Sequence, residues 1–340
     1  MNKFLENDLS LESQWRALIQ FGKNSATYKF AFAKALLELS GNKSNITLAD
    51  IAEPYSRNIT EHLLQNDKQG SSKSSTFLDE CRKYNQKEID KNRLLYLTEK
   101  LGFVNVVDAF QNINGGVISD KFYEKNYSKG KKEIILTDNF FKLCEGNQFT
   151  NLAKESEARW KLVETAWNLN LNPNMIVSFD KNKQVLFIND FSMKRVDITL
   201  ARNALNGYQK GKCFYSFKDL NIKDNLNCDV DHVLPHLNKS AHYFSKYPAD
   251  INGVWNLVLA DKKINRHEKS AKFPAKIYME RLHTRNEYYI TSKHPLAETI
   301  INQTGKTEVE RLRFLNFHWN LAKENCMVEF NSNEFPENKL

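Results

Sequence analysis

An aspartate followed directly by a histidine, at 231 and 232, combines two groups that suit metal-assisted chemistry. An unperturbed imidazole titrates near neutrality, at a pKa of about 6.5, so His232 could take a proton from water at physiological pH. The carboxylate of Asp231 is a hard oxygen ligand of the kind that Mg²⁺ prefers. Adjacent residues on a regular strand point to opposite faces, so we expect this pair where a strand ends or bends. A base beside a cation could activate water and neutralise charge developing on a phosphate.

Two asparagines follow, Asn256 and Asn265, nine residues apart. At about 100° per residue this spacing would put them on opposite sides of one continuous helix, so they cannot share a site in that way. We therefore expect Asn256 in the loop or at the helix start, where it would orient His232. Asn265 is expected on the helix itself, where its amide oxygen would be a second metal ligand.

Apolar spacing predicts that helix from about 257 to 268. A basic stripe beside Asn265 would hold the phosphate backbone of a nucleic acid. The apolar stripe consists of Leu257, Ala260 and Ile264, and the basic stripe consists of Lys262, Arg266 and Lys269.

The segments DVDHVLP, WNLVLA and KINRHEKS, in this order from 229 to 270, resemble the active-site segment of HNH nucleases, also called ββα-metal or His-Me finger enzymes. They are most similar to the HNH domains of RNA-guided CRISPR nucleases and of stand-alone bacterial HNH endonucleases. The resemblance covers roughly 210 to 276 and implies an H-N-N variant of the motif. It implies Asp231 and Asn265 as ligands of Mg²⁺ or Mn²⁺, His232 as general base and Asn256 as the middle asparagine.

The run KCFYSFKDL at 212 to 220 resembles the hairpin that opens many of these domains, where two C-x-x-C pairs bind zinc. Here Cys213 remains, but Ser216 takes the second position, and Asp261 and Ile264 take the places of the later pair. A structural zinc site needs about four nitrogen or sulfur ligands, so we predict no structural zinc. The hairpin is then expected to rely on packing by Phe214, Tyr215, Phe217 and Trp255.

The other histidines and the cysteines have simpler interpretations. His236 and His267 lie close enough in sequence to His232 and Asn265 to approach a phosphate. Cys213 and Cys228 are interpreted as reduced thiols on neighbouring strands, because five cysteines without a secretion signal favour a reducing compartment. Structural rather than catalytic roles are expected for His62, His242, His283, His294 and His318.

Composition sets the broad class of the protein. The chain has 340 residues, 41% hydrophobic residues, a formal charge of +8 and a pI near 9.0, which indicates a folded protein that fits an anionic partner. No apolar stretch approaches the roughly 20 residues that span a bilayer, and the first residues do not form a signal peptide. We expect a cytoplasmic protein with no membrane partner.

The pattern along the chain predicts a mainly helical α+β protein with a helical domain at 1–172, for recognition of substrate or partner. Thr47 with Asp50 predicts a short helix that stops before Pro54, and Thr76 with Asp79 predicts a long helix to Gly102. The lysine-rich stretch at 104–132 is interpreted as a solvated loop or, alternatively, a phosphate contact. Further helices are expected at 138–145 and 150–169.

A second domain at 173–330 is expected to hold the nuclease motif, with its core at 210–276, followed by a frayed tail at 331–340. A hairpin is predicted at 175–189, then a helix through Val196, Leu200 and Ala204. Helices are also predicted around Tyr278 and Leu282, from Pro295, and from a capping pattern of Thr307 with Glu310.

These patterns favour a metal-dependent endonuclease that hydrolyses DNA phosphodiester bonds, in a bacterial defence or restriction role. An RNA endonuclease is one alternative, because the chemistry needs no 2′-hydroxyl. A non-catalytic nucleic-acid-binding module regulated by a partner is the other. Since no base-reading motif is present, specificity would come from the N-terminal domain or from a protein partner encoded nearby.

Overall fold

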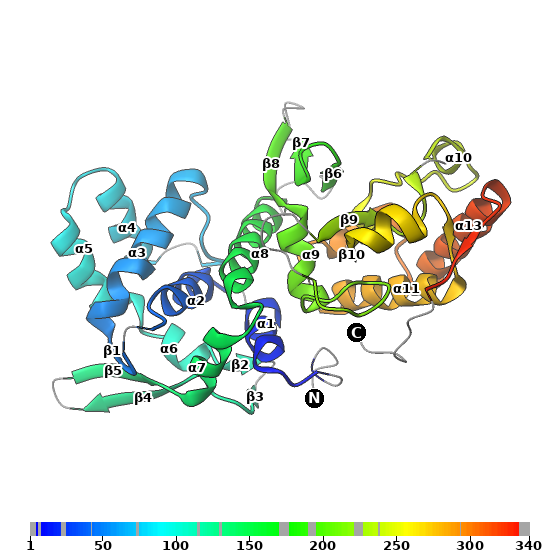
Figure 1. Ribbon diagram of the computed structural model, residues 1–340. Coiled ribbons are helices and arrows are strands. Elements are labelled where there is room, and N and C mark those ends of the chain that lie inside the picture. Colours follow the sequence, from blue (N-terminus) through cyan, green and yellow to red (C-terminus); the bar gives the residue numbers. More distant parts are fainter. Residues whose placement is uncertain are drawn as a thin grey trace. The chain divides into compact units, whose positions relative to one another are not determined.

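The chain divides into two compact units, Met1–Trp167 and Asn168–Leu340 (Figure 1). The structure is a computed structural model that describes all residues except 1–4, 6–7, 22–24, 42, 73–74, 114–115, 129–130, 170–176, 190–194, 221–226, 237–238, 293 and 333–340. In the described residues, helices predominate over small sheets, which confirms the predicted mainly helical α+β class. No described helix has both the length and the apolar character needed to cross a membrane.

The first unit packs helices around an aromatic core that includes Trp15, Phe32, Tyr55 and Trp160. Its main sheet is antiparallel, in the order β1-β5-β4, and β2 pairs with β3. The helices are α1 (Leu11–Phe21), α2 (Tyr28–Glu38), α3 (Leu48–Gln65), α4 (Thr76–Asn85), α5 (Lys91–Leu97), the π-helical segment η2 (Thr98–Gly102), α6 (Val106–Ala109), α7 (Asp138–Glu145) and α8 (Phe149–Leu169). The strands are β1 (Asn45–Thr47), β2 (Asn112–Ile113), β3 (Gly116–Val117), β4 (Tyr123–Ser128) and β5 (Lys131–Leu136).

Helix α3 begins where the sequence predicts but continues past Pro54, so the expected stop was wrong. Thr47 and Asp50 form the predicted capping box. Proline removes one backbone donor from the helix interior, which usually ends or kinks a helix. Here Ile51, Tyr55 and Ile59 recur every four residues and are fully buried, so their packing outweighs the lost hydrogen bond.

Two further expectations for the first unit were wrong. The long helix to Gly102 is divided, because Lys87 adopts a left-handed backbone (φ 64°) and Asp90 caps a new helix at the amide of Arg93. The lysine-rich stretch contains the β4–β5 hairpin rather than only a loop. Within it, Lys125 forms an ion pair with Asp108 at 2.6 Å, while Lys129 is outside the described residues.

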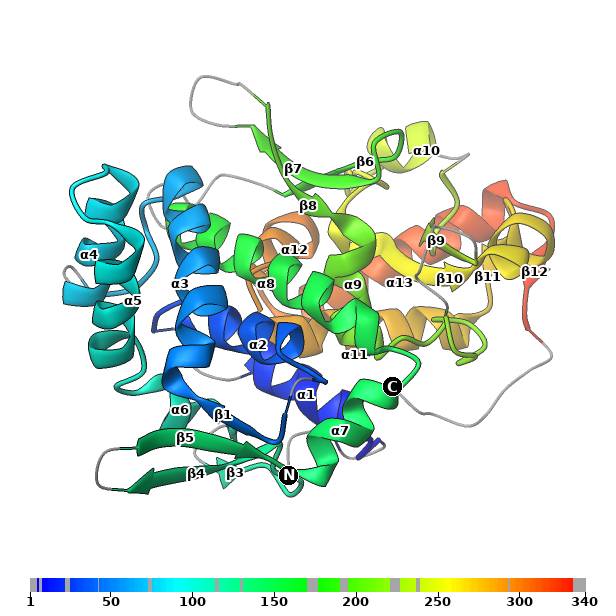
Figure 2. The same cartoon turned by 60° about the vertical axis from the view of Figure 1, so that its left-hand side comes forward.

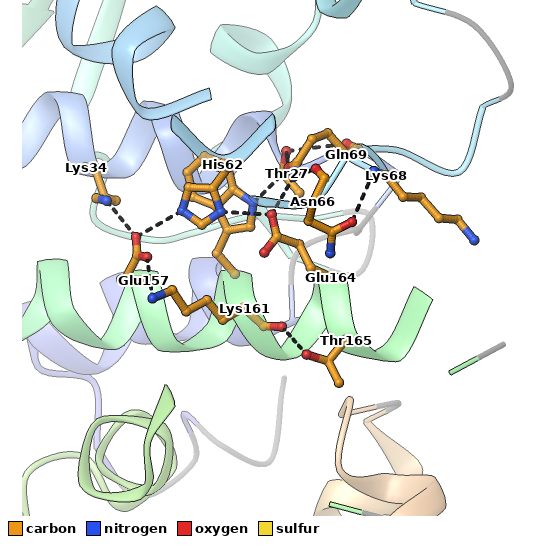
Figure 3. Close-up of polar contacts among 11 residues, drawn as sticks. Thr27, Lys34, His62, Asn66, Lys68, Gln69, Glu157, Lys161, Glu164 and Thr165 are labelled. Atoms are coloured by element: carbon orange, nitrogen blue, oxygen red, sulfur yellow. Dashed lines mark hydrogen bonds and ion pairs between the residues drawn. The ribbon is translucent and has the colours of Figure 1, made fainter. Parts of the chain in front are cut away.

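A partly buried ion network around His62 joins α3 to α8 (Figure 3). The His62 ring stacks on Trp160, with 3.6 Å between ring centroids. Its Nδ1 lies 2.8 Å from Glu164 and its Nε2 lies 3.2 Å from Glu157, which also pairs with Lys34. Burial lowers the pKa of His62, but the hydrogen bonds to the two carboxylates outweigh it and raise the pKa. Both ring nitrogens of His62 are occupied by carboxylates of the same chain, which indicates that His62 has a structural role.

The His62 network should make stability depend on pH. A raised folded-state pKa stabilises the protein fully below the unfolded value of about 6.5, and the stabilisation is lost as pH rises through the folded pKa. His62→Gln, which removes the charge, should lower the free energy of unfolding by about 3 kcal/mol near pH 6 and by much less near pH 9. Denaturant unfolding followed by tryptophan fluorescence between these values measures the difference. His267→Gln, at an exposed position, is the control; an equal loss at both pH values for His62→Gln would contradict the prediction.

In the second unit, helices pack around a short antiparallel hairpin. A separate sheet has the strand order β6-β7-β8, and these strands are labelled in Figure 2. Strands β9 and β10 form the hairpin, and β11 pairs in parallel with β12. The strands are β6 (Ser178–Asp180), β7 (Val185–Asn189), β8 (Arg195–Leu200), β9 (Cys228–His232), β10 (Leu257–Asp261), β11 (Phe273–Pro274) and β12 (Glu329–Phe330). The helical elements are α9 (Ala201–Gln209), α10 (Lys239–Tyr243), the 3-10 turn η5 (Val254–Asn256), the π-helical segment η6 (Ile264–Lys269), α11 (Lys276–Thr291), α12 (Ala297–Thr304) and α13 (Glu308–Asn325).

Several predictions for this unit are confirmed and two were wrong. The 175–189 hairpin is present in its described part as β6 and β7, and Thr307 with Glu310 caps α13. The helix expected through 196–204 is the strand β8 followed by α9, because β8 pairs with β7. The helix expected at 257–268 is also wrong, since 257–261 form β10 and only the part near Asn265 is helical. The last eight residues of the chain, within the expected tail, are outside the described residues.

Candidate functional site

Strands β9 and β10 place the Asp-His step at the end of a strand, as the sequence predicts. His232 is opposite Leu257, and Asp231 is opposite Val258. Helix α9 supports the hairpin through Gln209, whose side-chain amide bonds both the N–H and the C=O of Leu259. The predicted packing is also found, because Phe214, Tyr215 and Trp255 are fully buried and Phe217 is partly buried.

Asp231 is a buried carboxylate with two partners. The Tyr215 hydroxyl donates to its Oδ2 at 2.6 Å, and the Lys269 ammonium lies 3.2 Å from the same oxygen. Lys269 is only 1% exposed and also donates to the backbone carbonyl of His232 at 2.8 Å. Burial, and then the charge on Asp231, raise the pKa of Tyr215 well above its usual value, so its hydroxyl stays a donor. A cation therefore already compensates this carboxylate.

His232 is held in one tautomer by Asn252. The Oδ1 atom of Asn252 lies 3.0 Å from His232 Nε2, so that nitrogen is the donor and Nδ1 is the basic nitrogen of the neutral ring. Burial, and then the nearby His236, lower the pKa of His232 to about 3, against the raising effect of the hydrogen bond to Asn252. The imidazole is therefore neutral at physiological pH.

Asn256 does not contact the His232 ring, so its expected direct orienting role is corrected. Its Oδ1 accepts from the Leu234 N–H at 2.8 Å, and its Nδ2 donates to the carbonyls of Leu234 and Ile251 at 3.1 and 3.0 Å. Asn256 thus fixes the backbone turn that follows β9. Sequence reasoning missed Asn252, which makes the ring contact; its Asn-Gly step signals a turn but not this partner.

Asn265 lies on η6 and meets Asp229. Its Nδ2 donates to Asp229 Oδ2 at 3.2 Å, and Arg266 binds both oxygens of the same carboxylate at 2.7 and 3.2 Å. Asp229 and Asp231 are two residues apart on β9 and therefore share one face of the strand. Sequence reasoning missed Asp229, although this two-residue spacing was a signal for it.

The three residues of the predicted basic stripe lie in one helical stretch, 262–269, but they differ in exposure. Lys262 follows β10 directly, its backbone N–H donating to Asn227. The side chain of Arg266 is 55% exposed, whereas that of Lys269 is buried beside Asp231. Only Lys262 and Arg266 therefore remain accessible to a phosphate.

The residues at the broken zinc positions make other contacts. All five cysteines carry free thiols, and the sulfur of Cys213 accepts the backbone N–H of Asp261 at 3.3 Å. Burial raises the pKa of Cys228 to about 12, so it stays a neutral thiol. Within the described part of the chain, no three acidic, histidine or cysteine side chains converge as a metal-binding group.

Of the remaining histidines, two lie near the candidate site and four make contacts elsewhere in the second unit. The ring of His236 is 5.2 Å from that of His232, and His267 is exposed on η6. His242 and His318 are fully buried and face each other, with 2.8 Å between their Nδ1 atoms. His294 stacks on Tyr289, and His283 lies 3.9 Å from Glu287.

The chain matches no family model, no curated protein and no solved structure. The function is therefore inferred from the geometry of these residues. The described contacts bring together His232 with Asn252, Asp231 with Lys269, and Asn265 with Asp229.

Replacing Asn256 with alanine should destabilise the protein. Three backbone groups in a buried turn would lose their partners, so we expect Asn256→Ala to lower the free energy of unfolding by about 3 kcal/mol. Chemical denaturation monitored by circular dichroism measures this loss. Asn265→Ala, at a half-buried position with one side-chain hydrogen bond, to the Asp229 carboxylate, is the matched control and should cost less than about 1 kcal/mol. Equal losses for the two variants would contradict the assigned role of Asn256.

Proposed function

We propose that the second unit hydrolyses phosphodiester bonds in DNA with the help of a divalent metal ion. The observation that carries this proposal is a single strand, β9, that carries a neutral histidine held in one tautomer and two carboxylates. Such a pairing supplies a base for water and oxygen ligands for a cation. The resemblance of DVDHVLP and KINRHEKS to HNH nucleases supports the same chemistry.

His232 acts as the general base. Its Nδ1 accepts a proton from a water molecule, while Asn252 keeps the proton on Nε2 in place. The water oxygen then bonds to phosphorus, and the bond to the leaving oxygen breaks, with that oxygen taking a proton from solvent. A pKa of about 3 makes His232 a weak base in the free protein, so an approaching phosphate anion, which favours the imidazolium, would strengthen it.

The oxygen atoms at this site suit Mg²⁺ or Mn²⁺. Asp231 and Asn265 would hold the ion, and Asp229 adds a third oxygen donor on the same strand face. When bound, the ion supplies positive charge that stabilises the phosphate as the bond breaks. Lys269 already forms an ion pair with Asp231, so we assign Lys269 the role of holding this carboxylate in place.

Arg266 and Lys262 would contact the phosphates that flank the cut. Arg266 is largely exposed, and its guanidinium can form paired hydrogen bonds with a phosphate. These contacts are independent of base sequence, so selection of a target would come from other surfaces or a partner. A role in bacterial defence against foreign DNA is part of this proposal and rests on the family resemblance alone.

Loss of the histidine should abolish cleavage. Purified protein is incubated with plasmid DNA, single-stranded DNA and tRNA, with Mg²⁺ or Mn²⁺ or with chelator. We expect metal-dependent DNA cleavage that falls at least about 100-fold in His232→Ala, because the general base is gone. His283→Ala, a histidine on α11 outside the site, is the matched control. Cleavage of tRNA alone would replace DNA with RNA as substrate, and equal activity in His232→Ala would refute the base.

Asn252 should act as a positioning residue. Asn252→Leu removes the acceptor that fixes the His232 tautomer, so kcat should fall about 10-fold while KM changes little. Asn252→Asp keeps an acceptor at the same place and should recover most of kcat. A change in KM alone, or no recovery with aspartate, would show that Asn252 has only a structural role.

A further inference from the structure

The 233–252 segment, which joins β9 to the η5 turn, is fixed to the candidate site at both ends. At its start, Leu234 is bonded by Asn256, and at its end, Asn252 bonds the His232 ring. Its middle carries the short helix α10, which Figures 1 and 2 show at the periphery of the second unit. Helix α10 therefore belongs to the same segment of chain as Leu234 and Asn252.

Helix α10 is anchored by the fully buried His242. The Nδ1 atoms of His242 and His318 are 2.8 Å apart, which ties α10 to α13. The carbonyl of His242 accepts from the Ala249 N–H at 3.1 Å and from the Ser245 hydroxyl at 2.9 Å. These bonds close a compact loop from His242 to Ala249. The next two side chains, Tyr243 and Phe244, therefore extend from a fixed base.

Tyr243 and Phe244 form an exposed aromatic pair at this tip. Phe244 is 82% exposed and Tyr243 is 60% exposed, and their rings make an edge-to-face contact at 5.0 Å. Single exposed apolar residues are common, but two adjacent aromatic rings that project from an anchored loop present a continuous surface suited to binding.

The charge around this pair is positive. Lys239 and Lys246 are exposed on either side of it, and neither forms an ion pair with an acidic residue in the described part of the chain. Asp250 is the acidic residue of the segment, and its carboxylate accepts the backbone N–H of Asn252. Aromatic rings between unpaired lysines match a polymer that carries both flat bases and phosphates.

We propose that Tyr243 and Phe244 form a stacking platform for unpaired bases of a nucleic-acid strand bound at the candidate site, with Lys239 and Lys246 contacting its phosphates. This inference rests on the proposed nuclease function and specifies its substrate as a strand with accessible bases. Bases inside an intact duplex are already stacked, so the platform selects single-stranded or locally opened nucleic acid. It therefore contributes a preference for strand state rather than for sequence.

The length of the segment sets the reach of this contact. Phe244 and Asn252 are eight residues apart, so even a fully extended chain would separate them by at most about 28 Å. A strand that advances about 3.4 Å per nucleotide covers that distance in roughly eight nucleotides. An oligonucleotide of about twelve nucleotides is then long enough to reach both the platform and the site.

The test is equilibrium binding of a fluorescein-labelled twelve-nucleotide single-stranded DNA, measured by fluorescence anisotropy with chelator present so that no cleavage occurs. The same sequence is offered as a duplex, as RNA, and as a strand with abasic sites that keep the phosphates. Wild-type protein should prefer the strand with bases over the abasic strand. Phe244→Ala and Tyr243→Ala should each weaken binding of the strand with bases about 5- to 100-fold and leave abasic binding unchanged.

Matched variants separate this inference from the nuclease proposal. Tyr96→Ala removes another exposed tyrosine that lies beside cations, Arg93 and Lys100, in the first unit, and should bind normally. Phe244→Trp should retain binding, and His232→Ala should bind like wild type although it cannot cleave. Loss of binding in His232→Ala with normal binding in Phe244→Ala would overturn the platform.

Two other outcomes would also overturn it. One is equal affinity of the wild-type protein for the normal and abasic strands, or no binding of either. The other is a change in oligomeric state of Phe244→Ala, measured by light scattering, without a change in DNA affinity, which would assign the pair to contact between protein chains. Equal thermal midpoints for wild type and variants would show that folding is unchanged.

Discussion

The buried carboxylate of Asp231 is the constraint on which the candidate site depends. A charge removed from water must be compensated, and here the Tyr215 hydroxyl and the Lys269 ammonium both bind one of its oxygens. These partners come from the segment before β9 and from the end of η6, so one carboxylate joins three parts of the second unit. Lys269 then bonds the carbonyl of His232, which fixes the backbone of the residue proposed as base.

Two asparagines hold His232 in different ways. Asn256 bonds only backbone groups, and it shapes the turn after β9 without contact to the imidazole. Asn252 bonds the ring and selects its tautomer. Asn252 belongs to the 233–252 segment, and Asn256 bonds its backbone at Leu234. The same segment carries the exposed pair Tyr243 and Phe244, so one stretch of chain positions both His232 and this pair. Helix α11 supports the arrangement, since Arg285 and Asn286 bond the carbonyl of Trp255.

The sequence predicts local features of this site better than its long-range contacts. The end of β9 at His232 and the capping boxes of α3 and α13 follow from adjacent residues, and all three are observed. By apolar spacing alone, the run LVLA at 257–260 fits either a strand or a helix. Its hydrogen-bonded pairing with β9 makes it a strand. The contacts of Asn252 with His232 and of Lys269 with Asp231 join residues 20 and 38 positions apart in the sequence, where periodicity carries no information.

Under the proposed function, the charges on the β9 face would couple binding of a phosphate to binding of a divalent cation. Asp229 is paired with Arg266, and Asp231 is paired with Lys269, so each carboxylate already has its own cation. If Arg266 turned to a phosphate, Asp229 would keep the Asn265 amide but lose its cation, so a new positive partner at Asp229 would favour the exchange. Of the two basic residues, only Arg266 is exposed enough to make this exchange. Binding of a cation and binding of the strand would then reinforce each other through Asp229.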